Sequence, residues 1–418
     1  MYAEDTGMTF EPGEDVDCVV VGGGPGGMVL AYLLARGGAR VTLLESHSTF
    51  NRRFRGDSIA PAVLDFLHTL GLAEEMLATL PHTTVSTFDW HASGRVYTLA
   101  DYRRASSRFP YYALIPQARF LPFLAGKAAA FPGFTLNMRA RACRLLRDGT
   151  GRVTGVAYAR GDGERQIRAR LVVAADGRNS KLRALGGFTT HELGASLDIL
   201  WCAVPRRPDD PALSGLQLFS AAGCLLAVLN QETHWQLGYM IPAGSFSRVR
   251  EHGITPVVGA FAGQLPWLRD RLTELTDVNQ LTLLPVRITA VDRWYRPGLL
   301  LIGDAAHVIS PVGGNGINLA IADAAETANQ VLCSLPDPQA LDAACARVEA
   351  ARRELTDREQ RGQHRAERAA RARLEAGAAA PPYILRLISR IPGLAARNGR
   401  QNTALIRVPA PRPEILQR

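Results

Sequence analysis

Residues 17–45 read DCVVVGGGPGGMVLAYLLARGGARVTLLE, and this stretch decides the fold. A short apolar run at 18–21 is typical of a fully buried strand, and a second apolar run at 41–44 follows a helical stretch. The turn after the first run has the spacing G-x-G-x-x-G, formed by Gly22, Gly24 and Gly27. Strand, glycine turn, helix and second strand together predict the first unit of a nucleotide-binding α/β fold.

The glycine turn predicts a dinucleotide site. Its glycines allow a tight turn and a close approach of the backbone to a pyrophosphate. Pro25 and Gly26 lie within the same turn. The start of the following helix offers N–H groups and a positive dipole end to phosphates. Glu45 comes 18 residues after Gly27, where its carboxylate can accept the hydroxyls of an adenosine ribose. A glycine turn without a ligand is the alternative, and this stretch alone does not decide between NAD and FAD.

The whole chain has the composition of an ordinary soluble protein. Its 418 residues suffice for two or three domains, and 47% of them are hydrophobic and 21% charged. No apolar run approaches the roughly 20 residues that span a bilayer, and residues 1–15 are polar and acidic. We therefore expect a cytoplasmic enzyme with a flexible segment over residues 1–14. The six cysteines lack metal-ligand spacing, so we expect buried thiols in a reducing compartment and no metal site.

The formal net charge of +9 comes from an excess of arginine, with only two lysines. Many of the arginines follow residue 350, where acids are interleaved at helical spacing, as in Glu354 with Arg358 and Glu367 with Arg371. This pattern predicts a solvated, salt-bridged helix and not a nucleic-acid site. The positive field also favours an anionic substrate or a phosphorylated nicotinamide cofactor.

Two later stretches repeat the pattern of a buried strand that stops at an acid. Residues 171–177 read LVVAADG, and residues 299–307 read LLLIGDAAH. Each leaves a carboxylate, Asp176 or Asp304, at the carboxyl end of a parallel strand, where ligands bind in open α/β sheets. Each acid could instead cap the turn that follows it. His307 directly follows the second strand, so we expect a structural role for it and not the role of a base.

With these three sites, the sequence resembles the single-component, FAD-dependent aromatic hydroxylases typified by para-hydroxybenzoate hydroxylase, over roughly residues 16–335. The resemblance implies that FAD is the resident cofactor and that the glycine turn and Glu45 hold its ADP half. It also implies that Arg55 lies beside the cofactor and that Gln117 contacts it. The pair Asp176–Gly177 would interact with both flavin and nicotinamide.

Residues 303–318 would complete the cofactor site. Asp304, which follows Gly303, matches the aspartate that hydrogen-bonds the ribityl and pyrophosphate region. The sequence PVGGNGIN at 311–318 resembles the loop whose backbone amides approach the isoalloxazine. Amides at a helix start suit the negative edge of a reduced flavin, and glycines let the backbone approach a flat ring. The loop residues expected at the ring are Pro311, Gly314, Gly316 and Ile317.

The resemblance implies a flavoprotein monooxygenase. FAD would be reduced by NADH or NADPH, and O2 would then form a C4a-hydroperoxide that hydroxylates an aromatic or polyketide-like small molecule. By analogy with such enzymes, we expect a role in bacterial secondary metabolism such as antibiotic biosynthesis. A base that ionises the substrate would come from the strand-rich region, where the candidates are His91, His234, Tyr239 and Arg287. Packing or surface exposure is the more common role for each of them.

The predicted fold is α/β, with an FAD-binding, Rossmann-like domain of the glutathione-reductase type. An inserted, mostly antiparallel β-sheet domain would bind the substrate, and a helical region would end the chain. The expected ranges are 15–85, 109–186 and 297–335 for FAD binding, 86–108 and 187–296 for the substrate domain, and 336–418 for the C-terminal helices. We expect a monomer or a homodimer with no membrane span.

Three other functions stay open. An FAD-dependent reductase or oxidase of the geranylgeranyl-reductase kind would not couple NAD(P)H oxidation to oxygen insertion. A flavin-dependent halogenase would carry the motif W-x-W-x-I-P, whereas residues 237–242 read LGYMIP and lack both tryptophans. A non-catalytic flavin-binding protein is disfavoured because all three strand-end elements are intact.

Overall fold

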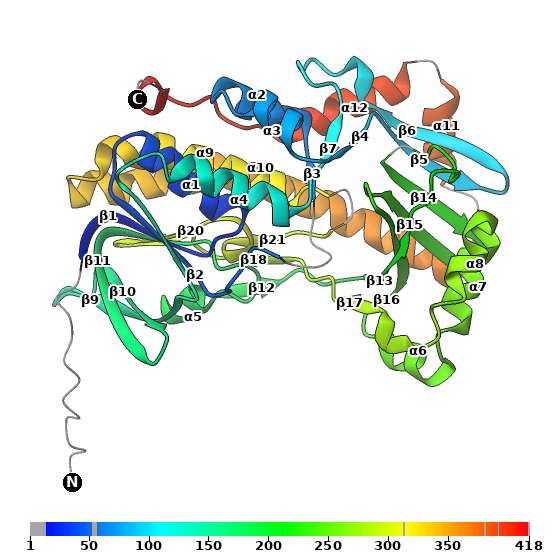
Figure 1. The fold of residues 1–418 in the computed structure, drawn as a ribbon, viewed down its shortest axis with the longest axis horizontal. Helices are drawn as coiled ribbons and strands as arrows, with labels where there is room; N and C mark the ends of the chain where they lie inside the picture. The colour runs from blue at the N-terminus through cyan, green and yellow to red at the C-terminus, as the bar shows by residue number, and fades with distance from the viewer. Residues whose placement is uncertain are drawn as a thin grey trace, which may run out of the picture.

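The computed structural model describes residues 14–51, 57–213, 215–311, 314–379, 382–391 and 393–416. Residues 1–13, where a flexible segment was expected, and Arg55, expected beside the cofactor, lie outside this part of the chain. The molecule is elongated, with a largely parallel sheet and its helices at one end and a second sheet at the other (Figure 1). This arrangement confirms the predicted fold class.

An eight-stranded sheet forms the core of the first part, with the order β19-β20-β11-β1-β2-β8 and with β10 and β9 following β11. Its strands are β1 (Glu14–Val21), β2 (Val41–Glu45), β8 (Phe134–Met138), β9 (Arg141–Arg147), β10 (Val153–Arg160), β11 (Gly163–Ala174), β19 (Tyr295–Arg296) and β20 (Leu299–Leu301). The strands β2, β1, β11 and β20 are parallel neighbours. Their side chains are buried on both faces, which explains the continuous apolar runs. The carboxyl ends of the three strands singled out in the sequence therefore meet at one edge.

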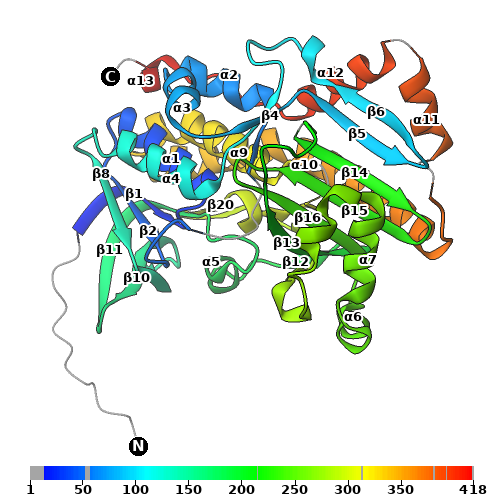
Figure 2. The ribbon, with the colours of Figure 1, turned by 45° about the vertical axis from the view of Figure 1, so that its right-hand side comes forward.

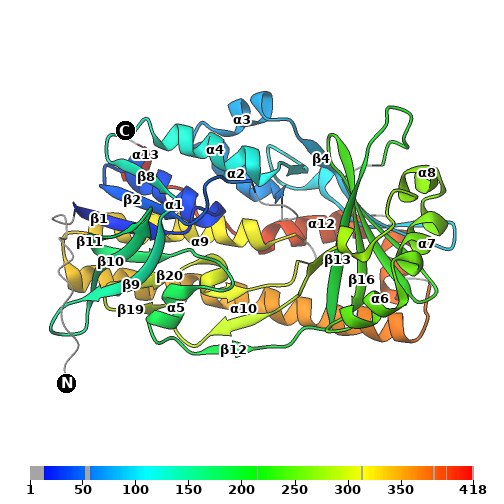
Figure 3. The ribbon, with the colours of Figure 1, turned by 60° about the horizontal axis from the view of Figure 1, so that its bottom comes forward.

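Helices cover one face of this sheet. They are α1 (Pro25–Arg36), α4 (Gln117–Ala128), α9 (Gly316–Val331) and α10 (Pro338–Glu375) (Figure 3). α1 packs against both α4 and α9, and α9 packs on α10. α10 continues past the edge of the sheet, so that Ala370 and Leu374 pack in the core of the second part. One helix therefore joins the two parts.

The second part is built on a seven-stranded sheet with the order β17-β13-β16-β15-β14-β5-β6. Its strands are β5 (Thr87–Ala92), β6 (Arg95–Asp101), β13 (Leu197–Pro205), β14 (Leu216–Ala221), β15 (Cys224–Asn230), β16 (His234–Pro242) and β17 (Thr282–Leu284). All pairings are antiparallel except that of β14 with β5. β5 with β6 and β15 with β16 form antiparallel hairpins.

The two faces of the seven-stranded sheet have different neighbours. One face, which carries Trp235, Leu237 and Tyr239, packs on α7 (Thr255–Gln264) and α8 (Arg269–Leu272) (Figure 2). The other face, which carries Ile199 and Met240, packs toward α10 and the first part. We call this second face the inner face of the sheet.

Smaller elements complete the structure. They are the three-stranded sheets β3 (Ser58–Ile59), β7 (Tyr112–Leu114), β4 (Thr83–Val85) and β12 (Thr190–Glu192), β18 (Thr289–Val291), β21 (His307–Val308), and the helices α2 (Pro61–Thr69), α3 (Ala73–Thr79), α5 (Lys181–Leu185), α6 (Phe246–His252), α11 (Tyr383–Arg390), α12 (Leu394–Leu405) and α13 (Pro413–Leu416). Within the described residues, no helix is both long and apolar enough to cross a membrane.

α7 ends at Gln264, because Leu265, the residue before Pro266, adopts φ −126° and ψ 66° and leaves the helical region. One expectation from the sequence was wrong. The pair Glu367–Arg371 does not form. Glu367 lies on the buried face of α10, 1% exposed, while Arg371 pairs with Glu375 on the exposed face.

A buried ion pair fastens α8 to the outer face of the seven-stranded sheet. The Arg271 guanidinium donates two hydrogen bonds of 2.7 Å to the carboxylate of Asp210, and both side chains are 3% exposed. The Trp235 indole N–H donates a third hydrogen bond to this carboxylate. Although burial opposes ionisation of Asp210, these hydrogen bonds lower its pKa to about 2.

Asp210 makes the stability of this part dependent on acid pH. Because its pKa is lower in the folded protein than in the unfolded chain, its contribution is present above about pH 4 and is lost as the pH falls toward 2. Urea denaturation between pH 5 and pH 2 measures this loss. Arg271→Ala should cost about 3 kcal/mol at neutral pH, because it leaves a buried carboxylate unpaired. Equal stability of Arg271→Ala and the native protein would contradict the assignment.

Candidate active site

A cleft with a volume of about 640 Å³ lies at the carboxyl edge of the parallel strands. It is bounded by the turns after β1, β2, β11 and β20, by the start of α9 and by the segment that follows β17. Every cofactor residue expected from the sequence and described by the structure lines it, namely Gly22, Gly24, Pro25, Gly26, Gly27, Glu45, Gln117, Asp176, Gly177, Gly303, Asp304, Pro311, Gly314, Gly316 and Ile317. Segments far apart in the chain thus form one continuous cleft.

The glycine turn brings α1 close to the sheet edge. Gly22 has φ +109°, and a Cβ there would lie 2.3 Å from the Ala175 carbonyl oxygen. A Cβ at Gly27 would lie 2.0 Å from the Gly22 carbonyl oxygen. Gly24 differs, because a Cβ there would meet no atom within 4 Å and would project into open space. Two of the glycines therefore serve packing, and the third leaves room for a ligand.

Two helices begin at the cleft without a capping side chain. Gly24 precedes α1 and Asn315 precedes α9, and neither helix start receives a side-chain hydrogen bond. The first amides of a helix have no partner within the helix, and they carry the positive end of its dipole. The chemistry of these two donor sets suits anionic groups, a pyrophosphate at α1 and the negative edge of a reduced flavin at α9.

The comparisons with known proteins agree with this geometry. Residues 15–359 match the family described as FAD binding domain. The chain belongs to this family. It is 34% identical over 389 residues to 6-methylpretetramide 4-monooxygenase of Streptomyces rimosus, covering 91% of this chain and 90% of that protein. The protein is therefore an FAD-dependent monooxygenase, with NAD(P)H and O2 as the co-substrates typical of its class.

Solved structures show the same fold. PqsL, a probable FAD-dependent monooxygenase from Pseudomonas aeruginosa, has a TM-score of 0.72 at 22% identity, covering 87% of this chain and 99% of that one. The myxobacterial chondrochloren halogenase CndH has a TM-score of 0.73 at 19% identity, covering 96% and 99%. The fold alone therefore does not separate oxygenation from halogenation, whereas the 34% identical relative favours a monooxygenase over the alternatives.

Glu45 supports the turn that would hold the ADP half of FAD. Its side chain is 1% exposed, and one carboxylate oxygen accepts the Gly23 amide at 2.8 Å. The other oxygen accepts the amide of His47 at 2.9 Å and faces the His47 ring nitrogen at 2.6 Å. Glu45 thus fixes the glycine turn in addition to lining the cleft. The sequence interpretation missed His47, because only proximity to Glu45 marks it.

Asp176 lies at the cleft and also caps a helix. Its carboxylate accepts hydrogen bonds from the Ser180 hydroxyl and from the Leu182 amide at 3.1 Å, at the start of α5. The structural alternative considered for this acid therefore holds at least in part. Gly177, with φ +83° and open space where a Cβ would be, continues the lining of the cleft.

A buried ionic network of Asp323, His307 and Arg352 supports the turn at Gly303–Asp304. The Asp323 carboxylate accepts the Gly303 amide at 3.0 Å, lies 2.6 Å from His307 Nε2 and accepts Arg352 Nε at 2.8 Å. Burial opposes ionisation of Asp323, but the charge and hydrogen bond at His307 and those at Arg352 lower its pKa to about 2. His307 therefore has the structural role expected of it, and Asp304 is left facing the cleft.

The loop at 311–318 was expected from the sequence to lie at the flavin, and we call it the flavin loop. Its described residues and the neighbouring Ser310 are tied to two other segments. The Ser58 hydroxyl donates to the Gly314 carbonyl at 2.9 Å, and the Ser310 amide donates to Gln363 Oε1 of α10 at 2.8 Å. Gly314 has φ +68°, and a Cβ there would lie 2.5 Å from the Ser58 hydroxyl. These bonds set the loop against the start of α9, where the amides of Gly316 and Ile317 begin the helix.

Gln117 opens α4 beside a partly buried acid, Asp57. Its amide donates to Asp57 at 3.2 Å, and burial raises the pKa of Asp57 to about 7 despite this hydrogen bond. Asp57 was not singled out from the sequence, because a lone Asp after a turn carries no distinguishing pattern.

Of the four residues considered as bases, only Arg287 lines the cleft. A guanidinium stays protonated in proteins, so Arg287 supplies positive charge and cannot act as a base. His91 stacks on Phe219 and bonds to Gln217, and Tyr239 packs edge-on to Phe261 under α7. His234 lies at the β15–β16 turn. None of these three side chains lines the cleft.

A matched set of glycine variants separates packing from cofactor binding. Gly27→Ala should lower stability by about 3 kcal/mol, because its Cβ would overlap a backbone carbonyl. Gly24 has φ −73°, which any residue adopts, so Gly24→Ala should fold normally and bind FAD at least about tenfold more weakly. Gly126→Ala, in α4 with no atom within 4 Å, is the control. Thermal unfolding and flavin titration measure the two effects, and an undiminished FAD affinity in Gly24→Ala would contradict the pyrophosphate assignment.

Proposed function

We propose that this monooxygenase hydroxylates a polycyclic, aromatic polyketide-like molecule in bacterial secondary metabolism. The observation that carries the proposal is the similarity, over nine-tenths of both chains, to the relative named 6-methylpretetramide 4-monooxygenase. Solved structures with the same fold include an anhydrotetracycline hydroxylase from Streptomyces rimosus. A cytoplasmic location fits a reaction that consumes NAD(P)H.

The inner face of the seven-stranded sheet is the proposed substrate wall. β17 and the segment after it line the cofactor cleft, and Leu284 and Val286 from this region also belong to the apolar cluster of the inner face. Trp201 pairs with Thr282 across β13 and β17, so the apolar surface continues from the cleft onto the sheet. Aromatic and aliphatic side chains of this kind suit a flat, weakly polar ring system and exclude water from the reaction.

FAD, when bound, supplies the redox chemistry and the activation of oxygen. The protein's own residues would hold and orient it. The start of α1 and Glu45 would bind the ADP half, and Asp304 would bind the ribityl region. The amides at the start of α9 would stabilise negative charge on the reduced ring. Of the four residues considered as bases, only Arg287 lines the cleft, and its guanidinium stays protonated, so we propose that a phenol already activated by its own ring system reacts.

The proposed domain organisation follows from the same geometry. The sheet that carries β5, β6 and residues 197–284 would bind the substrate, and the eight-stranded sheet with its helices would bind FAD. α10 would hold the two in register. The oligomeric state would be monomer or homodimer.

A substrate screen tests the function. The purified protein should be yellow and release FAD, and a correct aromatic polyketide should increase NADPH oxidation at least about tenfold over the basal rate. Oxygen consumption should then equal the hydroxylated product, measured with an oxygen electrode and mass spectrometry. Hydrogen peroxide as the only product with every polyketide tested would favour an oxidase and contradict the proposal. A halogenated product in the presence of chloride or bromide would contradict it as well.

A further inference from the structure

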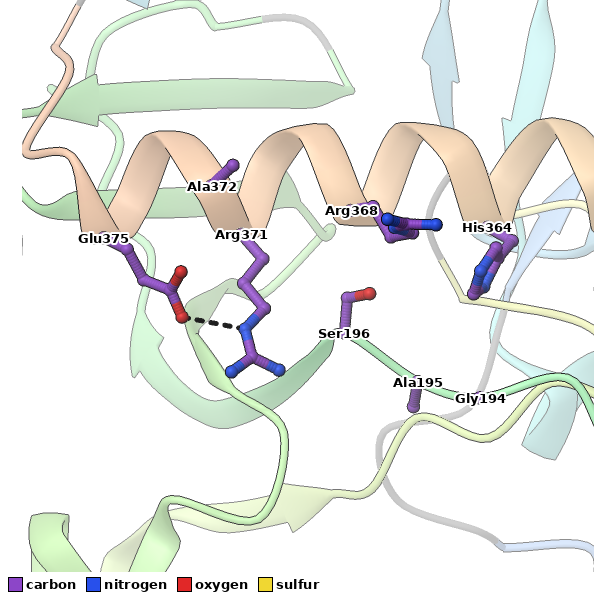
Figure 4. Close-up of a pocket in the computed structure, with 8 residues that line it drawn as sticks. All are labelled: Gly194, Ala195, Ser196, His364, Arg368, Arg371, Ala372 and Glu375. Carbon is purple, nitrogen blue, oxygen red and sulfur yellow. Dashed lines mark hydrogen bonds and ion pairs between the residues drawn. The ribbon is translucent and has the colours of Figure 1, made fainter.

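A groove separate from the cofactor cleft lies between α10 and the chain that joins β12 to β13 (Figure 4). It has a volume of about 520 Å³ and is lined by Gly194, Ala195, Ser196, His364, Arg368, Arg371, Ala372 and Glu375. The picture shows the side chains of His364, Arg368 and Arg371 along the same stretch of the helix, with Ser196 across from them. We call it the α10 groove.

The α10 groove carries positive charge that the protein itself does not neutralise. His364, Arg368 and Arg371 are spaced i, i+4 and i+7, which places them on one side of the helix. Within the described residues, Arg368 makes no ion pair or hydrogen bond, whereas the other groove arginine, Arg371, pairs with Glu375 at 2.8 Å. Some other arginines of α10 have partners, such as Glu349 for Arg353, whereas Arg365, like Arg368, has none in the described part of the chain. Arg368 is therefore available to a ligand.

The opposite wall of the groove is small and polar. Gly194 has φ +92°, a backbone conformation that favours glycine, and a Cβ there would lie in ordinary contact with the His364 ring at 3.6 Å. The Ser196 amide donates to the buried Glu367 carboxylate at 3.2 Å. Burial raises the pKa of Glu367, which favours its neutral form and reduces its repulsion of an anion.

Both walls lead directly to the flavin loop. On the helix wall, Gln363 precedes His364 and holds the Ser310 amide next to the loop. On the other wall, the Leu193 amide donates to the Ile288 carbonyl at 2.8 Å, beside Arg287 of the cofactor cleft. From Gln363 to Arg371 the helix rises by roughly 12 Å. An elongated ligand held in the groove could therefore extend to the flavin ring.

We propose that the α10 groove binds the phosphates of the nicotinamide dinucleotide that reduces FAD. This inference rests on the proposed function as far as the reductant is concerned. The sequence contains one G-x-G-x-x-G turn, and the FAD pyrophosphate would occupy it, so the second dinucleotide needs another phosphate site. Guanidinium groups match phosphate geometry with paired hydrogen bonds, and the net charge of +9 draws such an anion toward the surface.

Direct binding and flavin reduction together test the groove. NADP⁺ binding to the FAD-loaded protein is measured by calorimetry, and NADPH is then mixed anaerobically with the protein while the flavin absorbance is followed. In the double variant Arg368→Ala/Arg371→Ala, the Kd for NADP⁺ and the half-saturating NADPH concentration should rise at least about tenfold. Arg365→Ala removes one arginine from the same helix outside the groove and should change both by less than about twofold. Glu375→Gln should lower both, because it frees Arg371.

The outcomes separate the two proposals. FAD content, melting temperature and reduction by dithionite should be the same in all variants, which excludes a folding defect. Unchanged affinities in the double variant, or an equal loss in Arg365→Ala, would overturn the assignment. So would a loss of affinity for the organic substrate alone, which would make the groove a substrate site. Native protein that binds NADP⁺ through these arginines but never hydroxylates a polyketide would support the groove and refute the proposed function.

Discussion

The close contact between the Gly22 turn, α1 and the end of β11 is the constraint on which the rest of the structure depends. A Cβ at Gly22 or Gly27 would overlap backbone atoms of Ala175 or Gly22, so α1 can approach the sheet edge only through bare backbone. This approach aims the start of α1 at the carboxyl ends of β1, β11 and β20. The glycine side of the cleft and the uncapped amides of α1 follow from where α1 begins.

The strand ends could be predicted from the sequence because their physics is local. An apolar run followed by glycine or an acid predicts a buried strand and also the residue at which the strand ends, as at 18–22 and 299–304. Parallel pairing then brings such ends together without further information. The fold class and the strand-end residues that line the cleft were accessible in this way, whereas Gln117 and the loop at 311–318 came from the family resemblance.

Contacts between distant segments left no comparable pattern. Glu367 and Arg371 have the spacing of a surface ion pair, but the rotation of α10 buries the acid against Ser196. Nothing in the sequence of β16 tells which of its faces turns outward, and only the packing of α7 shows that Tyr239 does. Asp323 lies in the middle of an ordinary amphipathic helix, and its role under Gly303 depends on His307 and Arg352.

The parallel pairing of β14 with β5 has a consequence for how the chain folds. The seven-stranded sheet takes β5 and β6 from residues 87–101 and its other strands from 197–284, while four strands of the eight-stranded sheet, β8, β9, β10 and β11, are encoded between them. Neither sheet is therefore a continuous stretch of the gene. During synthesis, more than a hundred residues are made between the β5–β6 hairpin and β14, the strand that pairs with β5. The sheet therefore depends on contacts of high sequence separation, which slow folding. Any division of the gene into two separately expressed halves would cut one sheet or the other.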